Sequence, residues 1–229
     1  MTRIFMLLLL LCTVQQRADA QDKNTDALAR DISAANSSSV DALATYIKQQ
    51  FATDTARIRA IYVWVAHHIS YDLARFNARQ KNSNMPPQTV ADVLASRSAV
   101  CAGYSDLFVA LCKGVGIDAV VIGGYTKQEG KVSPIAHAWV AAMLEGEWYL
   151  FDPTWGAGYV KDNSFVKWFN NAFYKVPPAK FVADHMPFDP LFQLLPHPYT
   201  HKEFIEGRPA AQKETFYYKD SLRHHNQLS

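Results

Sequence analysis

The sequence predicts an α+β fold, because segments with helical periodicity come first and segments with strand patterns follow. In residues 54–70, apolar side chains recur at helical spacing, and Asp54 is the expected N-cap. Residues 118–125 form an apolar run that is typical of a buried strand. Residues 136–144 and 148–155 flank a short turn, which is the pattern of a β-hairpin.

Two further helices and a loop are predicted before the middle of the chain. Residues 39–51 favour a helix that begins after Ser39 as its N-cap. Residues 89–96 favour a shorter helix, and the Asn, Ser and Pro content of residues 78–88 predicts a loop. The last third of the chain is rich in aromatic residues and proline, and we expect it to wrap the core as loops and short elements.

A helix is predicted to begin at Cys101, and it decides whether Cys101 and Cys112 can form a disulfide. Its apolar stripe consists of Tyr104, Phe108, Leu111, Cys112 and Val115, and Gly114 and Gly116 are expected to end it. The first twenty residues, which include Cys12, have the pattern of a signal peptide (see the next paragraph), so Cys101 and Cys112 would be the two cysteines of an exported chain. Two cysteines in such a chain commonly form a disulfide. On one straight helix, Cys101 and Cys112 would lie about 16 Å apart along the axis, whereas a disulfide needs Cα atoms within about 7 Å. Either the helix prediction is wrong or these thiols are not paired.

The first twenty residues have the pattern of a signal peptide. Arg3 gives a positive start, residues 4–14 are a short apolar run, and residues 18–20 form a small-x-small cleavage site. We therefore expect cleavage after residue 20 and an exported protein, periplasmic or secreted. Retention of the segment is an alternative, as is lipid attachment at Cys12, although leucine precedes that cysteine where a small residue is expected. The apolar run is too short to favour a membrane span, and no transmembrane segment is expected after cleavage.

Length and charge narrow the class of protein. The chain has 229 residues, of which 49% are hydrophobic and 19% charged, and this length suits one domain. We expect a flexible lead over residues 21–38, the domain over 39–206 and a polar tail over 207–229. The formal charge of +2 falls to +1 without the first twenty residues, which contain two arginines and one aspartate. A nearly neutral chain gives no electrostatic case for nucleic acid or an anionic membrane as partner.

Cys101 is the candidate nucleophile. At the N-terminus of a helix, unpaired N–H groups and the helix dipole favour the thiolate over the thiol. The thiolate is the nucleophilic form of cysteine.

His137 and Asp152 are the candidate base and its orienting acid. Pairing Leu144 with Glu147 across the hairpin turn places His137 opposite Thr154. Asp152 then lies two positions along and points to the same face, as a diagonal neighbour of His137. If the Cys101 helix packs on that face, the thiol can meet the imidazole, an arrangement that follows the logic of papain-like enzymes.

Each of these residues taken alone has an ordinary structural interpretation. A cysteine on an amphipathic helix is commonly a small core residue, and we interpret Cys112 in this way. A single histidine in a strand and an aspartate before proline are commonly structural. The joint placement of Cys101, His137 and Asp152 favours the catalytic interpretation.

Three motifs in order resemble the transglutaminase-like cysteine superfamily. They are Cys-x-Gly-Tyr at Cys101–Tyr104, His-Ala-Trp at His137–Trp139 and Asp-Pro-Thr-Trp at Asp152–Trp155. The resemblance covers about residues 54–155. The later segment "FVADHMPFDPLFQLLPHPYTHKEF" is similar to the kyphoscoliosis-peptidase-like branch of that superfamily.

The resemblance implies a papain-like, transglutaminase-like core with the cysteine helix packed on an antiparallel sheet. It also implies that Cys101 is the nucleophile, His137 the base and Asp152 its orienter. The calcium-dependent cross-linking members are much longer, and no Asp-rich calcium loop is present in this sequence. We therefore expect neither a cofactor nor a metal.

Other residues around the site have candidate roles. The backbone N–H of Cys101 is one expected oxyanion donor, and Gln88 and Tyr71 are two candidates for a second. Substrate-groove candidates are Trp139, Trp155 and Tyr104, with packing around the site as the alternative for the tryptophans. The remaining histidines considered, His67, His68, His197 and His201, have no nearby ligands at fixed spacing that would indicate a metal site.

Two hypotheses of function follow. The first is an exported cysteine acyl-transfer enzyme, a peptidase or amidase if water is the acceptor and a transamidase if an amine is. Its substrate would be a protein or peptide, plausibly of the cell envelope. The second is a non-catalytic transglutaminase-like binding module of the cell envelope, in which the three residues are unused.

Overall fold

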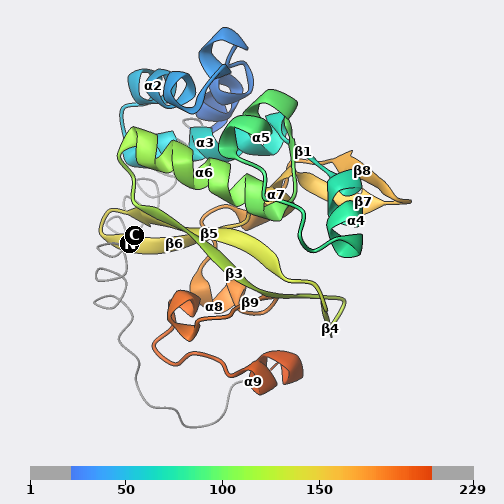
Figure 1. Cartoon of the computed structure of the whole chain (residues 1–229). Coiled ribbons are helices and arrows are strands. Elements are labelled where there is room, and N and C mark those ends of the chain that lie inside the picture. Colours follow the sequence, from blue (N-terminus) through green and yellow to red (C-terminus); the bar gives the residue numbers. More distant parts are fainter. Residues whose placement is uncertain (1–21, 208–229) are drawn as a thin grey trace, which may run out of the picture.

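The computed structural model of the protein describes residues 22–207 and contains an antiparallel sheet, with the longer helices of the first half of the chain on one side and the short helices near the C-terminus on the other (Figure 1). The sheet has the strand order β4-β3-β5-β6, and β9 also pairs with β3. Its strands are β3 (Ala119–Gln128), β4 (Lys131–Val132), β5 (His137–Leu144), β6 (Glu147–Phe151) and β9 (His185–Pro187). The helix α6 (Cys101–Val115) packs against β3 and β5. The α+β class and the packing of the cysteine helix on the sheet are confirmed.

Three helices coincide with predicted ones. They are α2 (Val40–Gln50), α3 (Asp54–His68) and α5 (Val90–Ser96). The Ser39 hydroxyl accepts a hydrogen bond from the Ala42 N–H and so caps α2 as predicted. The cap of α3 is Thr53 rather than Asp54, because the Thr53 hydroxyl accepts a hydrogen bond from the Ala56 N–H.

The helix α4 (Leu73–Lys81) occupies the first part of the predicted loop over residues 78–88, so that prediction is wrong for residues 78–81. The Asp72 carboxylate accepts a hydrogen bond from the Arg75 N–H and starts the helix. The Asn, Ser and Pro residues that indicated a loop all follow Lys81.

Gly114 and Gly116 have different roles in α6. Gly116 has a positive φ of 87° and ends the helix, as predicted. Gly114 lies inside the helix, where a Cβ would come within 2.6 Å of the Ala44 Cβ on α2. Gly114 therefore allows α2 and α6 to pack closely and does not end the helix.

The segment expected as a flexible lead, residues 21–38, is part of the fold from residue 22 onward. Residues 22–30 are helical, and η1 (Ala35–Ser37) follows as a single 3₁₀ turn. Ala29 and Ile32 are buried in the main core. Asp26 receives two hydrogen bonds of 2.6 Å from the guanidinium of Arg59, which is itself buried on α3. This bidentate ion pair and the buried side chains attach the segment to the helix layer.

The β-hairpin has the predicted register, with Leu144 paired to Glu147. The strand β6 ends at Phe151, however, and α7 (Pro153–Ala157) begins two residues later. Proline at the first helical position suits the start of a helix. His137 is therefore not opposite Thr154, and the prediction is wrong on this point, because the chain leaves the strand before it reaches that position.

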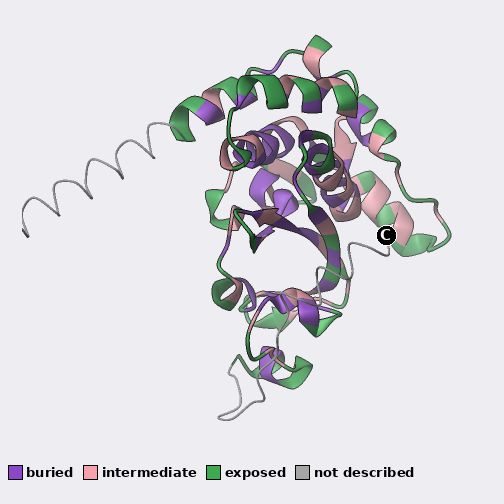
Figure 2. Ribbon diagram, turned by 90° about the vertical axis from the view of Figure 1, so that its left-hand side faces the viewer, coloured by how far each residue is buried: buried purple, intermediate pink, exposed green. Residues whose placement is uncertain are grey.

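Two hydrophobic cores use alternate residues of the strands. The core shared with the helices includes Val140, Ala142 and Leu144, whereas the second core includes Trp139, Ala141, Phe181 and Leu191. Figure 2 shows buried residues concentrated where the helices face the sheet. His137 is the first residue of β5 and lies two positions before Trp139, so by strand alternation it is on the same face of the sheet as Trp139.

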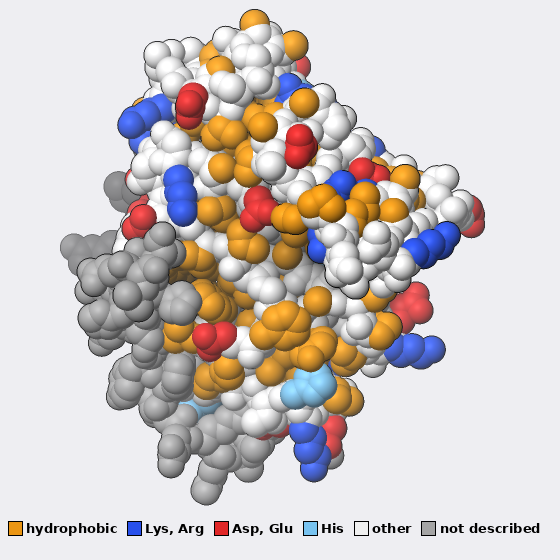
Figure 3. Space-filling model, in the orientation of Figure 1, with side chains coloured by type: hydrophobic (Ala, Val, Ile, Leu, Met, Phe, Trp, Pro, Cys, Tyr) orange, Lys and Arg blue, Asp and Glu red, His pale blue; other side chains and the backbone are white. Residues whose placement is uncertain are grey.

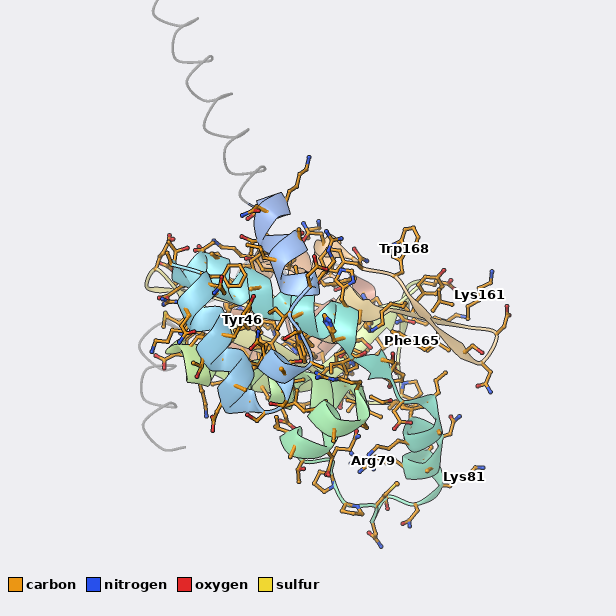
Figure 4. The ribbon with its side chains drawn as sticks, turned by 90° about the horizontal axis from the view of Figure 1, so that it is seen from above. Tyr46, Arg79, Lys81, Lys161, Phe165 and Trp168 are labelled. Carbon is orange, nitrogen blue, oxygen red and sulfur yellow. The ribbon has the colours of Figure 1, made fainter. Side chains whose placement is uncertain are left out.

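The C-terminal third wraps the core in short elements, as expected. They are β7 (Gly158–Lys161), β8 (Ser164–Lys167), η2 (Asn171–Phe173), α8 (Pro178–Phe181), η3 (Pro190–Gln193) and α9 (His201–Glu206), together with β9. The hairpin of β7 and β8 extends away from the helices, with Lys161 near its tip (Figure 4). On β8, Phe165 packs against Tyr71, with ring centroids 6.2 Å apart.

The proposed signal peptide over residues 1–20 and the polar tail beyond Gly207 lie outside the described residues. Within residues 22–207, no helix combines the length and the hydropathy needed to cross a bilayer. On the face shown in Figure 3, hydrophobic side chains gather at the level of the sheet, and charged side chains of both signs are scattered around them. This distribution agrees with the nearly neutral composition.

Gly124 is predicted to be required for the pairing of β9 with β3. A Cβ at Gly124 would lie 2.2 Å from the Met186 carbonyl oxygen and 2.4 Å from Cη2 of Trp139. We expect Gly124→Ala to lower the free energy of unfolding by about 1–3 kcal/mol, measured by urea denaturation.

The neighbouring Gly123 provides a matched control, since a Cβ there would meet only the Phe188 ring at 3.4 Å, an ordinary contact. Gly123→Ala should change the free energy of unfolding by less than about 0.5 kcal/mol. Equal effects of the two substitutions would contradict the close approach of β9 to Gly124.

Candidate active site

Cys101 is the first residue of α6 and is half-buried. Val100 precedes it as the N-cap and offers no side-chain acceptor, so no side chain caps the first N–H groups of the helix. Burial by itself raises the pKa of the Cys101 thiol. The hydrogen bond and charge of His137, together with a hydrogen bond from the Ala138 N–H, lower this pKa by more than burial raises it. The pKa of this thiol therefore lies below its usual value, which favours the nucleophilic thiolate.

The Gly and Tyr of the Cys-x-Gly-Tyr motif position the start of α6. A Cβ on Gly103 would lie 2.9 Å from the Ala99 Cβ and 3.0 Å from Cγ2 of Val93, so glycine allows α5 to approach the first turn of α6. The Tyr104 hydroxyl donates a 2.6 Å hydrogen bond to the Ile69 carbonyl. These two contacts fix the end of α6 that carries the thiol.

His137 connects the thiol to a carboxylate. Its Nε2 lies 2.8 Å from Oδ2 of Asp152, and the ring also hydrogen-bonds the Cys101 thiol. With Nε2 engaged by Asp152, Nδ1 is the ring nitrogen left for Cys101. Burial lowers the pKa of His137, but Asp152 and Cys101 outweigh burial and raise this pKa to about 10. At neutral pH the imidazole is therefore protonated beside a thiol with a lowered pKa.

Asp152 is fully buried at the N-cap of α7. Its Oδ1 accepts hydrogen bonds from the Thr154 and Trp155 N–H groups at 2.8 Å and 3.0 Å. Its Oδ2 accepts from His137. Burial by itself raises the pKa of Asp152. The charges and hydrogen bonds of the neighbouring histidines lower this pKa by more than burial raises it, so it lies well below its usual value. The Asp-Pro-Thr-Trp motif therefore encodes a helix cap that holds an ionised carboxylate toward His137.

Together, Cys101, His137 and Asp152 form a continuous chain of hydrogen bonds. A thiolate can attack a carbonyl carbon, and the adjacent imidazolium can deliver a proton to the leaving group. The carboxylate fixes the ring orientation and stabilises its charged form. This arrangement suits acyl transfer through a thioester.

Cys101 and Cys112 are both free thiols, and they lie on one helix as predicted. Cys112 is fully buried, and burial raises the pKa of its thiol. Its interpretation as a small core residue agrees with this position.

The two oxyanion candidates differ in their surroundings. Tyr71 lies on β1 (Ser70–Tyr71), which pairs with β2 (Ser98–Ala99) just before α6. Burial raises the pKa of its hydroxyl, and the negative charge of Cys101 raises this pKa further. Gln88 instead uses its amide group to donate a 3.1 Å hydrogen bond to the Ser98 carbonyl. Tyr71 is therefore the candidate whose pKa depends on the charge of Cys101.

Only one of the three groove candidates keeps exposed surface. Trp139 and Tyr104 are fully buried, so neither lines an open groove. Trp155 is half-buried, and its ring lies 5.6 Å from the His137 ring, between centroids. Trp155 is thus the groove candidate that borders both the site and solvent.

His185 is a site residue that the sequence reasoning missed. It lies on β9, is almost fully buried, and its Nε2 lies 3.1 Å from Oδ2 of Asp152. The only sequence signal was an Asp-His pair in the segment that resembles the kyphoscoliosis-peptidase-like branch. Nothing local to that segment indicates that it returns to the site.

Ligand atoms of His137, Asp152 and His185 lie within 4.8 Å of one another, which is close enough for a metal ion. Hydrogen bonds between the histidines and Asp152 already account for this spacing. His67 and His68 lie elsewhere and stack on Phe169 and Trp64, respectively. His201 lies against Tyr125, with ring centroids 5.0 Å apart.

Comparison with known proteins identifies relatives of the chain. A family model described as the transglutaminase-like superfamily matches residues 41–153, a range that contains Cys101, His137 and Asp152. Human kyphoscoliosis peptidase is 33% identical over 200 residues, which cover 84% of this chain and 29% of that protein. Hillarin of Drosophila melanogaster is 25% identical over 185 residues, which cover 72% of this chain and 22% of that protein.

One solved structure with a detectable likeness is the periplasmic domain of TgpA from Pseudomonas aeruginosa. It has 30% identity and a TM-score of 0.39, over 51% of this chain and 42% of that chain. The chain spans less than a third of the length of the curated relatives described above. By its family match and its similarity to kyphoscoliosis peptidase, the chain belongs to the transglutaminase-like superfamily, in the kyphoscoliosis-peptidase-like branch.

Proposed function

We propose that this protein is an exported cysteine acyl-transfer enzyme that acts on amide bonds of proteins or peptides. The observation that carries the proposal is the position of His137, whose ring bonds the Cys101 thiol on one side and Asp152 on the other. A fully buried carboxylate is costly unless it is compensated. Here the Asp152 carboxylate orients the His137 imidazole, and the imidazole contacts the half-exposed Cys101 thiol. Acyl transfer requires this arrangement of acid, base and nucleophile.

In the first step, the Cys101 thiolate attacks the amide carbonyl carbon and forms a carbon–sulfur bond. His137 transfers its proton to the amide nitrogen, the carbon–nitrogen bond breaks, and the amine leaves. In the second step, neutral His137 takes a proton from water, and the resulting hydroxide attacks the thioester. The carbon–sulfur bond breaks, the acid leaves, and the thiolate–imidazolium pair is restored.

Charge that develops on the substrate oxygen needs hydrogen-bond donors. The Cys101 N–H lies at a helix terminus without a side-chain cap and is the first candidate. The Tyr71 hydroxyl is the second, because it responds to the charge at Cys101. Both donors would stabilise the tetrahedral intermediate more than the planar amide.

Hydrolysis is favoured over transfer to an amine, because no feature of the described residues selects an amine over water. Two relatives are named kyphoscoliosis peptidase, which agrees with hydrolysis. The signal-peptide pattern of residues 1–20 supports export, and a periplasmic or secreted enzyme would meet proteins and peptides of the cell envelope.

Cys101→Ala is predicted to abolish amide cleavage while the protein stays folded. Cleavage of a peptide library should fall to background, because the step has no other nucleophile, and circular dichroism should be unchanged. Wild-type protein should form a thioester adduct visible by mass spectrometry.

Cys112→Ala is the matched control, since it removes the buried thiol on the same helix. It should retain cleavage and should lose only about 1 kcal/mol in the free energy of unfolding. Undiminished cleavage by Cys101→Ala would rule out the mechanism.

The Cys101 thiol is predicted to react with iodoacetamide at about pH 6, where an ordinary thiol is less than about 1% ionised. Cys112 in the same native molecule should remain unlabelled, because burial raises the pKa of its thiol. His137→Ala should slow labelling of Cys101 roughly 100-fold at this pH, since it removes the cation that stabilises the thiolate. Slow labelling in both proteins would favour the binding-module hypothesis.

Asp152→Asn is predicted to shift the pH dependence of kcat/KM. Asp152 and Cys101 together raise the pKa of His137 to about 10, so the imidazolium persists below about that pH in the wild type. Without the negative charge this pKa falls, and the alkaline limb should move to lower pH by at least about one unit. An unchanged alkaline limb would mean that Asp152 does not govern the proton on His137.

A further inference from the structure

His185 is almost fully buried, yet both of its ring nitrogens face carboxylate oxygens. Nε2 lies 3.1 Å from Oδ2 of Asp152, and Nδ1 lies 2.5 Å from Oδ1 of Asp184. An ionised carboxylate can only accept hydrogen bonds, so each ring nitrogen must donate. A histidine that donates from both nitrogens is an imidazolium.

Aromatic rings exclude solvent from this imidazole. Phe181 stacks on it with ring centroids 4.0 Å apart, and Trp155 and Trp139 lie edge-on at 4.6 Å and 5.1 Å. The titratable groups that face the ring are Asp184 beside it on the chain, Asp152 at the cap of α7 and His137 on β5. Asp184 is the only one of these described neighbours with substantial exposure, at 39% of its side chain.

One carboxylate oxygen, Oδ2 of Asp152, thus accepts hydrogen bonds from two imidazoles, those of His137 and His185. The groups follow one another in the order Asp184, His185, Asp152, His137 and Cys101, and their charges alternate when the thiolate forms. During the proposed reaction, His137 becomes neutral once it has protonated the leaving amine. At that stage Asp152 loses one of its two cationic partners, and a buried carboxylate without a cation is costly.

We propose that His185 is a positioning residue that supplies Asp152 with a second positive charge beside that of His137. It holds the carboxylate ionised and oriented in the acyl-enzyme, where His137 must be neutral to accept a proton from water. By sharing Oδ2 it also limits how strongly Asp152 retains the proton on His137. This inference rests on the proposed function for its catalytic meaning, while the charge of His185 and its effect on His137 are properties of the free protein.

Two substitutions separate the hydrogen bond from the charge. His185→Gln keeps an N–H donor near the position of Nε2 but removes the charge, and His185→Phe removes both. His201→Gln is the matched control, because His201 lies against Tyr125 and makes no recorded contact with Asp152.

The readout is the pH dependence of Cys101 labelling by iodoacetamide. Loss of a nearby cation disfavours the thiolate, so His185→Gln should label about tenfold more slowly at about pH 6 and recover at about pH 8. An unchanged profile, or an equal loss at every pH, would overturn the proposal, because a purely structural role does not move the profile.

Nitrogen-15 NMR of histidine-labelled wild-type protein supplies a second readout that needs no variant to fold. The proposal expects both ring nitrogens of His185 to stay protonated between about pH 6 and about pH 8. One unprotonated ring nitrogen in this range would overturn it.

The two readouts also separate this inference from the proposed function. Ordinary reactivity of Cys101 in the wild type would contradict the proposed function. The protonation of the two His185 ring nitrogens, read by NMR, would still decide the inference.

Discussion

The site depends on one buried carboxylate. Asp152 has no exposed surface, and its carboxylate accepts four hydrogen bonds, two from backbone N–H groups and two from histidines. A buried charge with incomplete compensation would destabilise the fold by several kcal/mol. The same hydrogen bonds that offset burial orient His137 and keep it protonated beside Cys101. The stability of the local fold and the reactivity of the thiol are therefore linked through the same contacts.

The fold places this carboxylate where four structural elements end or begin. The strand β6 stops at Phe151, α7 starts at Pro153, and Asp152 between them serves as the helix cap. His137 begins β5, and Cys101 begins α6, so each reactive group sits at an element terminus and not in its middle. Residues at such positions are held by rigid elements while their side chains remain free to point out of the regular structure.

Local patterns predicted much of this arrangement. The helix from Cys101 and the pairing of Leu144 with Glu147 follow from short-range periodicity and turn geometry. The exit of Asp152 from the strand was missed, although Pro153 favours a helix start. His185 was not predictable locally, because its position depends on the pairing of β9 with β3, which brings it opposite Thr126. The docking of residues 22–30 depends likewise on a distant partner, Arg59.

The central claim is that Cys101 is a thiolate paired with protonated His137 in the free protein. Its most direct test is the ultraviolet absorbance of the thiolate, titrated with pH as a difference between wild type and Cys101→Ser. The account predicts thiolate absorbance well below neutral pH, and its loss from that range when His137 is replaced by alanine. Absorbance that appears only near the titration range of a free cysteine, at about pH 8.5, would contradict the account.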